Sequence, residues 1–305
     1  MDWRRHFVWY PSGTGTKGNT MSLAPVGIVG AGRVGAVLGA RLRASGYPVV
    51  AVAARSEASL LRARTFLPGV PVREAAEVVG ASEVLVLAVP DDSLAALAEE
   101  LAEHVRPGQL VIHTSGRHGR AVLAPLAEVG ARTAAFHPAM TFTGSDVDVD
   151  RPCVVGLTTT DEDRAAVEAL ALAVGGTPVH VAEADRVVYH AALAHGANHV
   201  VTVLNQAMDL LRSIGVSDPS SVLEPLVRAS VTNTLAYGDA ALTGPVARGD
   251  AHTVAAHVGA ITDREIASTY TALSAATIER ALRDGRVDES AAAQLRGTLS
   301  AGIER

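Results

Sequence analysis

A G-x-G-x-x-G turn is the part of this sequence best suited to bind a ligand. Gly30, Gly32 and Gly35 leave a short apolar run and open a segment with helical periodicity. The first glycine permits a tight turn, the second lets the backbone approach a pyrophosphate, and the third lets helix and strand pack closely. The N-terminus of the helix then offers free N–H groups to the diphosphate. We predict a dinucleotide site whose loop includes Arg33 and Val34; the alternative is a turn that serves packing only.

The residues after the second apolar run indicate which dinucleotide binds. That run, Val49 to Ala54, ends in Arg55 and Ser56 rather than in a carboxylate. An Asp or Glu at this point would bind the ribose 2′-hydroxyl of NAD. An arginine and a serine instead suit the 2′-phosphate of NADP, through a charge-assisted hydrogen bond and a hydroxyl donor. The predicted cofactor is therefore NADP, used as NADPH.

Polar side chains follow three further predicted strands. Val89 and Pro90 end one strand and are expected to line the cofactor, while the aspartates after them are candidate caps of the next helix. Ser115, in the H-T-S-G sequence of the next strand end, offers a hydroxyl to a substrate carboxylate or carbonyl, with an ordinary turn as the alternative. His137 ends another strand and is either a site residue or a turn histidine.

A helix later in the chain has an unusual polar seam. Its other faces carry alanine, valine and leucine rather than charge, which is typical of a helix that lines a cleft. The seam consists of His195, Asn198, His199, Thr202 and Asn205. The alternatives are a seam that hydrogen-bonds to neighbouring helices and a metal site at the two histidines. We predict no metal, because no acidic third ligand stands nearby.

An irregular glycine-containing segment offers one more site residue. Arg248 lies next to a glycine and is a candidate clamp for a substrate carboxylate or phosphate, while Asp250 is expected to cap the following helix. Arg228 and Thr232, one helical turn apart, are an alternative anion site; a surface arginine is the commoner case.

The periodicity of the chain predicts a two-domain α/β protein. Short apolar runs alternate with helical segments up to about residue 182, which indicates a mostly parallel, doubly wound sheet of the Rossmann type. The predicted strands are Val26–Val29, Val49–Ala53, Val84–Val89, Leu110–His113, Ala134–Phe136, Cys153–Leu157 and Val179–Val181. Only helices are predicted beyond them: Ala184–Ile214, Pro219–Tyr237, Asp250–Ala260, Asp263–Asp284 and Glu289–Ile303. We expect a flexible tail at 1–21, a Rossmann domain at 22–182 and an all-α domain at 183–305.

Composition excludes several classes of protein. The net charge of −6 and the dispersed arginines argue against a nucleic-acid partner, and no apolar run is long enough to span a membrane. Cys153 is the only cysteine, so a disulfide framework is excluded, and a cytoplasmic location is expected. Lys17 is the only lysine and lies in the predicted tail, so a catalytic lysine in the folded body is also excluded.

From Ser22 onward the motifs resemble one bacterial family that joins a Rossmann-like domain to a helical domain of unknown function. In chain order these motifs are G-I-V-G-A-G-R-V-G at 27–35, V-P-D-D at 89–92, H-T-S-G at 113–116, F-H-P at 136–138 and L-T-G-P-V-A-R-G-D at 242–250. The family is similar in architecture to pyrroline-5-carboxylate reductases, 6-phosphogluconate and β-hydroxyacid dehydrogenases, and ketopantoate reductases. The resemblance implies NADP use, a helical domain like the C-terminal domain of 6-phosphogluconate dehydrogenase, and homodimers whose helical domains interlock.

One position departs from those relatives. The hydroxyacid dehydrogenases and ketopantoate reductases place a catalytic lysine four residues before an asparagine; Asn198 matches the asparagine, but Ala194 takes the place of the lysine. The proton donor is then His195, His137 or a water. We predict an NADP-dependent reductase of a small carbonyl or imine, such as the 2-keto acid ketopantoate. The alternatives are a non-catalytic NADP-binding sensor or scaffold and a deazaflavin-dependent NADP reductase.

Overall fold

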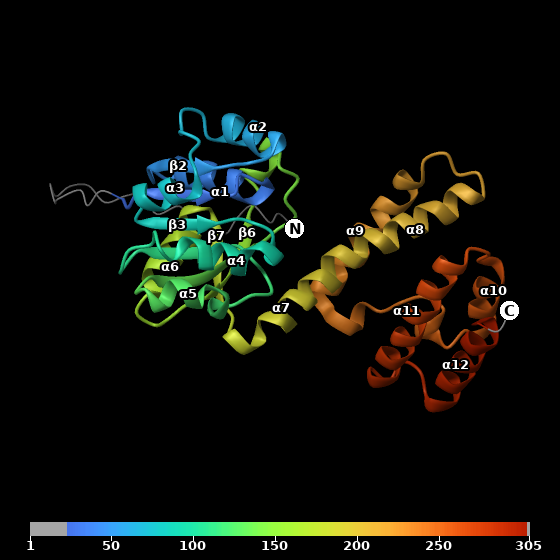
Figure 1. Cartoon of the computed structure of the whole chain (residues 1–305). Coiled ribbons are helices and arrows are strands. Elements are labelled where there is room, and N and C mark those ends of the chain that lie inside the picture. Colours follow the sequence, from blue (N-terminus) through green and yellow to red (C-terminus); the bar gives the residue numbers. More distant parts are fainter. Residues whose placement is uncertain (1–22, 304–305) are drawn as a thin grey trace, which may run out of the picture. The chain divides into compact units, whose positions relative to one another are not determined.

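The computed structural model describes residues 23–303, which divide into two compact units between Leu193 and Ala194 (Figure 1). The first unit is a sheet with helices on both faces and the second is helical. The predicted tail at 1–21, Lys17 and residues 304–305 lie outside the described residues.

The first unit is built on a seven-stranded sheet of order β2-β1-β3-β4-β5-β6-β7. Its strands are β1 (Val26–Val29), β2 (Val49–Ala53), β3 (Val84–Leu87), β4 (Leu110–His113), β5 (Arg132–Ala139), β6 (Cys153–Thr158) and β7 (Gly176–His180). The first five strands pair in parallel, whereas β6 is antiparallel to β5 and β7 is parallel to β6. The loops that follow β1 to β5 therefore share one edge of the sheet, where ligands bind in folds of this type.

Helices cover both faces of this sheet because the strand side chains alternate between two cores. Val26 and Ile28 pack into one core and Val29 into the other. The helices are α1 (Arg33–Ala44), α2 (Glu57–Phe66), α3 (Ala75–Ala81), α4 (Asp91–Leu101), α5 (Ala124–Glu128), α6 (Arg164–Ala173) and α7 (Arg186–Leu193).

The second unit is formed by long helices (Figure 1). They are α8 (His199–Ser213), α9 (Pro219–Tyr237), α10 (Ala251–Ala260), α11 (Arg264–Arg283) and α12 (Glu289–Ile303). Helices α10, α11 and α12 enclose a core around Val254, Ile278 and Leu295. By contrast, α8 has no buried residue and α9 has only Pro219.

The helix predicted over Ala184–Ile214 occurs as one continuous run of helical turns from Glu183 to Ser213, but it is not α-helical throughout. The segment contains α7, a π-helical turn at Ala194–Asn198 and α8. Helix α7 belongs to the first unit, since Arg186 is buried there and donates hydrogen bonds to Thr158 and to the backbone carbonyls of Ala135 and Gly156. A π-turn inserts one residue into the helical ladder and is frequently found at functional sites. Apolar periodicity alone did not reveal this interruption.

Candidate functional site

The three glycines of the turn have different spatial requirements. Gly30 has φ = +101°, and a Cβ there would lie 2.4 Å from the carbonyl oxygen of Ala88. A Cβ at Gly35 would lie 2.0 Å from the carbonyl oxygen of Gly30. Gly32, the N-cap of α1, has φ = −70°, and a Cβ there would meet no atom within 4 Å. The fold therefore requires glycine at two of the positions, while the third faces open space, as expected where a ligand approaches the backbone.

The loops after β1 and β3 meet at this turn. Gly30 donates its N–H to Ala53 at the end of β2, and a Cβ on Gly30 would approach Val89 to 3.2 Å. Because β1 connects to β2 on one side and pairs with β3 on the other, this is the switch point of the sheet. Val89 and Pro90 thus lie at the carboxyl edge of the sheet, where the sequence analysis predicts them.

Arg55 and Ser56 stand at the start of α2. The Ser56 hydroxyl accepts a hydrogen bond from the N–H of Ser59 at 3.2 Å, so Ser56 caps the helix. Arg55 is exposed and forms no ion pair with any described residue. A cation without a carboxylate partner beside a helix N-terminus is suited to bind a phosphate.

Two further arginines, which the sequence analysis did not assign together, lie near Gly144. A Cβ at Gly144 would come within 2.9 Å of Arg33 Cγ and 3.1 Å of Arg62 Nε. Neither arginine is paired with a carboxylate within residues 23–303. Arg62 lies on α2, whereas Arg55 precedes the N-cap Ser56 of that helix.

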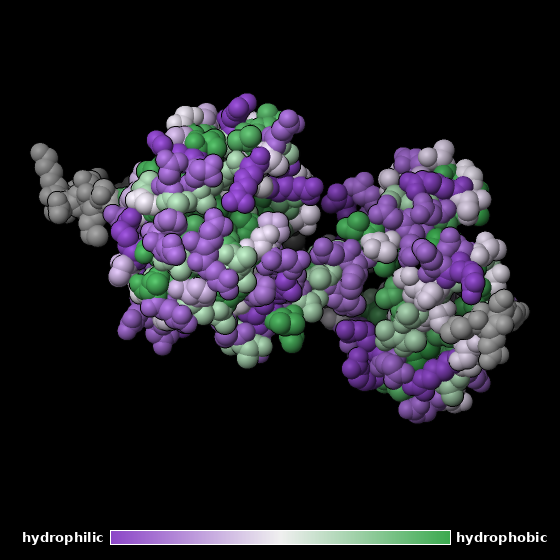
Figure 2. Space-filling view, in the orientation of Figure 1, coloured by the Kyte–Doolittle hydropathy of each residue, from purple (hydrophilic) through white to green (hydrophobic). Residues whose placement is uncertain are grey.

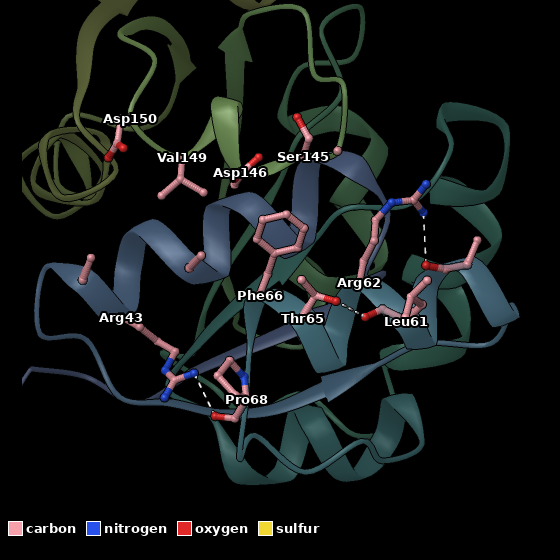
Figure 3. Close-up of a pocket in the computed structure, with 14 residues that line it drawn as sticks. Arg43, Leu61, Arg62, Thr65, Phe66, Pro68, Ser145, Asp146, Val149 and Asp150 are labelled. Atoms are coloured by element: carbon pink, nitrogen blue, oxygen red, sulfur yellow. Dashed lines mark hydrogen bonds between the residues drawn. The ribbon is translucent and has the colours of Figure 1, made fainter.

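A hollow of about 1120 Å³ lies beside this cluster, between α1, α2 and the loop 144–150 (Figure 3). Arg43 and Arg62 line it from the helices, Phe66 and Leu61 supply apolar surface, and Asp146 faces them from the loop. The loop 144–150 follows β5, and the hollow shares Arg62 and Gly144 with the arginine cluster.

His113, at the end of β4, is a structural residue. It is fully buried, its Nε2 lies 2.8 Å from the carbonyl oxygen of Gly119, and its Nδ1 accepts the N–H of Ser115. Burial lowers the pKa of His113 to about 4, against a weaker opposing effect of the Gly119 hydrogen bond. The neutral ring thereby holds the loop after β4. Within this loop, the Ser115 hydroxyl accepts the N–H of His118, and the predicted site residue is buried.

His137 lies in a cluster of rings at the edge of the sheet. Its Nδ1 is 3.1 Å from the hydroxyl of Tyr189, and its ring meets those of Tyr189 and His190 edge to face, with centroids 5.7 and 6.0 Å apart. Burial is the main cause that lowers the pKa of His137 to about 4, and the charges of His190 and Arg186 lower it further. The ring is therefore neutral at physiological pH. The sequence analysis missed Tyr189 and His190, because both lie beyond its predicted domain boundary.

The aspartates after Pro90 are not helix caps, which corrects the prediction for them. Pro90 itself occupies the N-cap of α4, and no side chain caps the helix. Asp91 and Asp92 instead form ion pairs with Arg117 at 3.1 and 2.8 Å. These contacts connect the loops after β3 and β4.

The predicted site residues of the second unit are exposed. His195 and His199 approach each other through their Nδ1 atoms at 3.1 Å, and Asn198 ends the π-turn. No group of three metal-ligating side chains occurs among the described residues. Arg248 is exposed in a short 3₁₀ turn, while Asp250 accepts the N–H of Thr253 and caps α10 as predicted.

Comparison with known proteins identifies both domains. Residues 14–138 match the model of a Rossmann-like domain, and residues 153–277 match the model of a domain of unknown function, DUF2520. The chain therefore joins a Rossmann-like domain to a DUF2520 domain, which confirms the predicted resemblance. No curated protein matches the sequence. In residues 23–303, no helix is long and apolar enough to cross a bilayer.

Solved structures of similar fold include several oxidoreductases. A candidate NADP oxidoreductase from Bacteroides fragilis has a TM-score of 0.73 at 22% identity, over 85% of this chain and 99% of that one. A reductive aminase from Aspergillus terreus, in complex with NADPH and ethyl-5-oxohexanoate, has a TM-score of 0.56 at 20% identity over 92% and 94%. A pyrroline-5-carboxylate reductase from Coxiella burnetii has a TM-score of 0.53 at 18% identity over 93% and 98%. These matches confirm the predicted fold class.

Acid should destabilise the first unit through its buried histidines. The pKa of His113 is about 4 in the folded chain and 6.5 in the unfolded one, so the unfolded state binds more protons between these values and stability falls as pH drops from 6.5 to 4. His113→Gln removes this ionisation but keeps a donor for Gly119. We expect the variant to lose about 1–2 kcal/mol at pH 7 and to show a weaker loss of stability on acidification in urea titrations.

His104→Gln, which changes an exposed histidine of the same unit, is the control and should unfold like the wild type at pH 7. Equal acid sensitivity in His113→Gln and wild type would contradict a buried neutral His113.

Proposed function

We propose that this protein is an NADP-dependent oxidoreductase that reduces a small carbonyl or imine, with 2-keto acids such as ketopantoate among the candidate substrates. The observation that carries the proposal is the glycine turn, in which the fold itself requires Gly30 and Gly35 but leaves open space at Gly32. When bound, NADPH would supply the hydride. Two similar folds support this proposal: a reductive aminase crystallised with NADPH and a pyrroline-5-carboxylate reductase.

The residues present fit the cofactor. Gly30, Gly32 and Gly35 would hold the pyrophosphate at the N-terminus of α1, where the helix has no acidic residue in its first turn. Arg33, Val34, Val89 and Pro90 would line the cofactor, and Ser56 would cap α2 beside it. Arg55, just before the N-cap of α2, would bind the 2′-phosphate, with Arg62 on α2 as a further cation.

We assign proton delivery to side chains other than lysine, because lysine is absent from the described residues. His137 lies at the edge of the sheet with its Nδ1 against Tyr189, and Ser115 lies in the neighbouring loop. His195 and Asn198, at the π-turn, and Arg248, as an anion clamp, remain proposed substrate contacts in the second unit. A histidine can donate a proton to an alkoxide or an amine anion in place of lysine.

Two variants test the cofactor site by NADPH and NADH titration. Gly32→Asp places a favourable N-cap residue in open space, so the melting temperature should not fall, but its carboxylate would repel a diphosphate. We expect NADPH affinity to drop more than tenfold, about 1.4 kcal/mol or more. Gly32→Ser, which caps without charge, is the control and should retain more affinity. Unchanged affinity in Gly32→Asp would contradict the pyrophosphate site.

The Arg55→Ala variant should weaken NADPH about tenfold and leave NADH binding unchanged, because only NADPH carries the 2′-phosphate. Arg64→Ala removes an exposed arginine from α2, the helix that follows Arg55, and is the matched control. Equal binding of the two nucleotides to the wild type would rule out the assigned role of Arg55.

A turnover screen separates the proposed enzyme from its alternatives. The full chain with NADPH should oxidise the nucleotide on addition of a 2-keto acid, an aldehyde or a cyclic imine, as followed by the absorbance of the reduced nicotinamide. Tight NADPH binding with no turnover on any of these compounds would favour the sensor or scaffold. Loss of reduced deazaflavin absorbance on addition of NADP would favour the deazaflavin-dependent reductase.

A homodimer through the second unit is also proposed, and a cytoplasmic location remains a prediction. Large apolar side chains are exposed on α8 and α9: Val200, Val201, Val203, Val222, Leu226, Val231, Leu235 and Tyr237. Figure 2 shows apolar residues, in green, at the surface of the helical unit. Only Glu224 and Arg228 are charged on α9, and they pair with each other. A nearly neutral apolar face of this kind is typical of an interface between subunits.

Light scattering tests the dimer. The wild type should have twice the 31.4 kDa mass of the chain, and the double variant Leu226→Asp/Leu235→Asp should be monomeric because two charges would be buried at the interface. Leu61→Asp, at a leucine of the first unit as exposed as Leu226, is the control. A monomeric wild type would overturn the proposal.

A further inference from the structure

The two nitrogens of His137 have different surroundings. Nδ1 lies 3.1 Å from the hydroxyl of Tyr189. Nε2 has no hydrogen-bond partner among the described residues and lies beside Gly116, where a Cβ would come within 3.0 Å of it. Any larger residue at 116 would crowd this nitrogen. One nitrogen of the ring therefore lies against a hydroxyl, and the other lies beside Gly116 and the ring of His190.

A second glycine allows Tyr189 to reach the histidine. Gly156 on β6 is the register partner of His137 on β5. A Cβ at Gly156 would lie 2.4 Å from the Tyr189 hydroxyl. The phenol of α7 thus lies directly against the sheet backbone beside His137, which places the hydroxyl in a fixed position rather than in solvent.

A buried cation lies beside the phenol. Arg186 is 1% exposed, and its guanidinium carbon is 5.7 Å from the centre of the Tyr189 ring. Its Nε and Nη2 donate to Thr158 and to two backbone carbonyls, while Nη1 is buried without a partner in the described chain. Arg186 has no carboxylate partner there, so its charge is available to stabilise a negative oxygen on Tyr189.

We infer that Tyr189 is a positioning residue that donates its hydroxyl proton to Nδ1 of His137 and so holds the Nε2–H of that ring ready for transfer to a substrate anion. The inference rests on the proposed reductase, in which hydride addition leaves a negative oxygen or nitrogen on the substrate. Tyr189 acts through His137 and does not contact the substrate in this proposal.

The proton steps balance. The substrate anion takes the proton from Nε2 of His137 as the N–H bond breaks, and Nδ1 takes the proton from the Tyr189 hydroxyl, so the ring is neutral before and after. The phenolate that remains lies near the positive charge of Arg186. It takes its proton back from Nδ1 as Nε2 takes one from solvent, which restores the starting tautomer. The ring thus never needs to become imidazolium, a form that burial and the neighbouring charges disfavour.

The other titratable groups around His137 support a neutral ring. The charges of His190, Arg186 and His113 all lower the pKa of His137, and Asp91 is the one named neighbour that raises it. Burial raises the pKa of Tyr189, and Arg186 opposes that rise. Both partners are therefore uncharged at neutral pH, with a proton available on each.

The chain contains a matched control for the experiment. His257 and Tyr270, on α10 and α11 of the second unit, form the same kind of pair, with Nδ1 2.8 Å from the hydroxyl and the rings at 80°. Tyr189→Phe and Tyr270→Phe each remove one hydroxyl and keep the ring. Only the first should affect His137.

Nitrogen-15 NMR of histidine-labelled full chain tests the inference without substrate or cofactor. In the wild type at pH 7, His137 should carry its proton on Nε2, with Nδ1 as acceptor. Tyr189→Phe should shift His137 toward a mixture of tautomers, and Tyr270→Phe should leave it unchanged. A proton on Nδ1 in the wild type, or the same tautomer in Tyr189→Phe, would overturn the inference.

Kinetics with NADPH and either ketopantoate or 1-pyrroline provide the second readout. Tyr189→Phe should lower kcat by roughly 10²-fold, with KM and NADPH affinity close to wild type, and Tyr270→Phe should match the wild type. Equal kcat in Tyr189→Phe would overturn the relay. If the wild type turns over neither compound, the NMR result still decides the tautomer, so failure of the proposed function is distinguishable from failure of this inference.

Discussion

The close approach of backbone segments at the carboxyl end of β1 is the constraint on which this site depends. The carbonyl of Gly30 occupies the place of a side chain at Gly35, and the carbonyl of Ala88 occupies the place of one at Gly30. The turn, which is the loop after β1, can therefore pass close to the loop after β3. It directs the N-terminus of α1 toward the carboxyl edge of the sheet. Gly32 alone is free of this packing. The physical consequence is an anion-binding helix end with an open approach, set where β1 lies between β2 and β3.

A second set of close contacts organises the opposite part of the same edge. Gly116 and Gly156 leave room for the His137 and His190 rings and for the phenol of Tyr189. Arg186 ties α7 to the sheet through Thr158 and two carbonyls and remains a buried cation beside them. Burial keeps His113 and His137 neutral for different purposes, since His113 has both nitrogens occupied by backbone and His137 has one available. The same edge thus combines the proposed phosphate-binding end with a neutral hydrogen-bonding end.

Most of the fold could be predicted from local patterns. Strands Val26–Val29, Val49–Ala53 and Leu110–His113 and helices Pro219–Tyr237 and Glu289–Ile303 occur with the predicted bounds, because uninterrupted apolar runs and regular helical spacing are local signals. Two features were not predicted. The π-turn within the helix over Ala184–Ile214 preserves apolar composition while it shifts the helical phase, so composition did not reveal it. The aspartates after Pro90 were predicted as caps, yet they pair with Arg117, 26 and 25 residues later, which no local pattern indicates.

By itself, the sequence determined the glycine turn, the Arg55–Ser56 pair that follows β2, the alternation of strands and helices and the absence of lysine from residues 23–303. Each of these is read directly from the order of residues in the chain. Only the tertiary structure decided which polar groups share a site. It brought His137 on β5 beside Tyr189 on α7, 52 residues away, and opposite Gly156 on β6. It also placed Arg62 and Arg33 on either side of Gly144. Such pairings depend on strand register and on how α7 packs against the sheet. Neither can be predicted from the residue spacing within one segment.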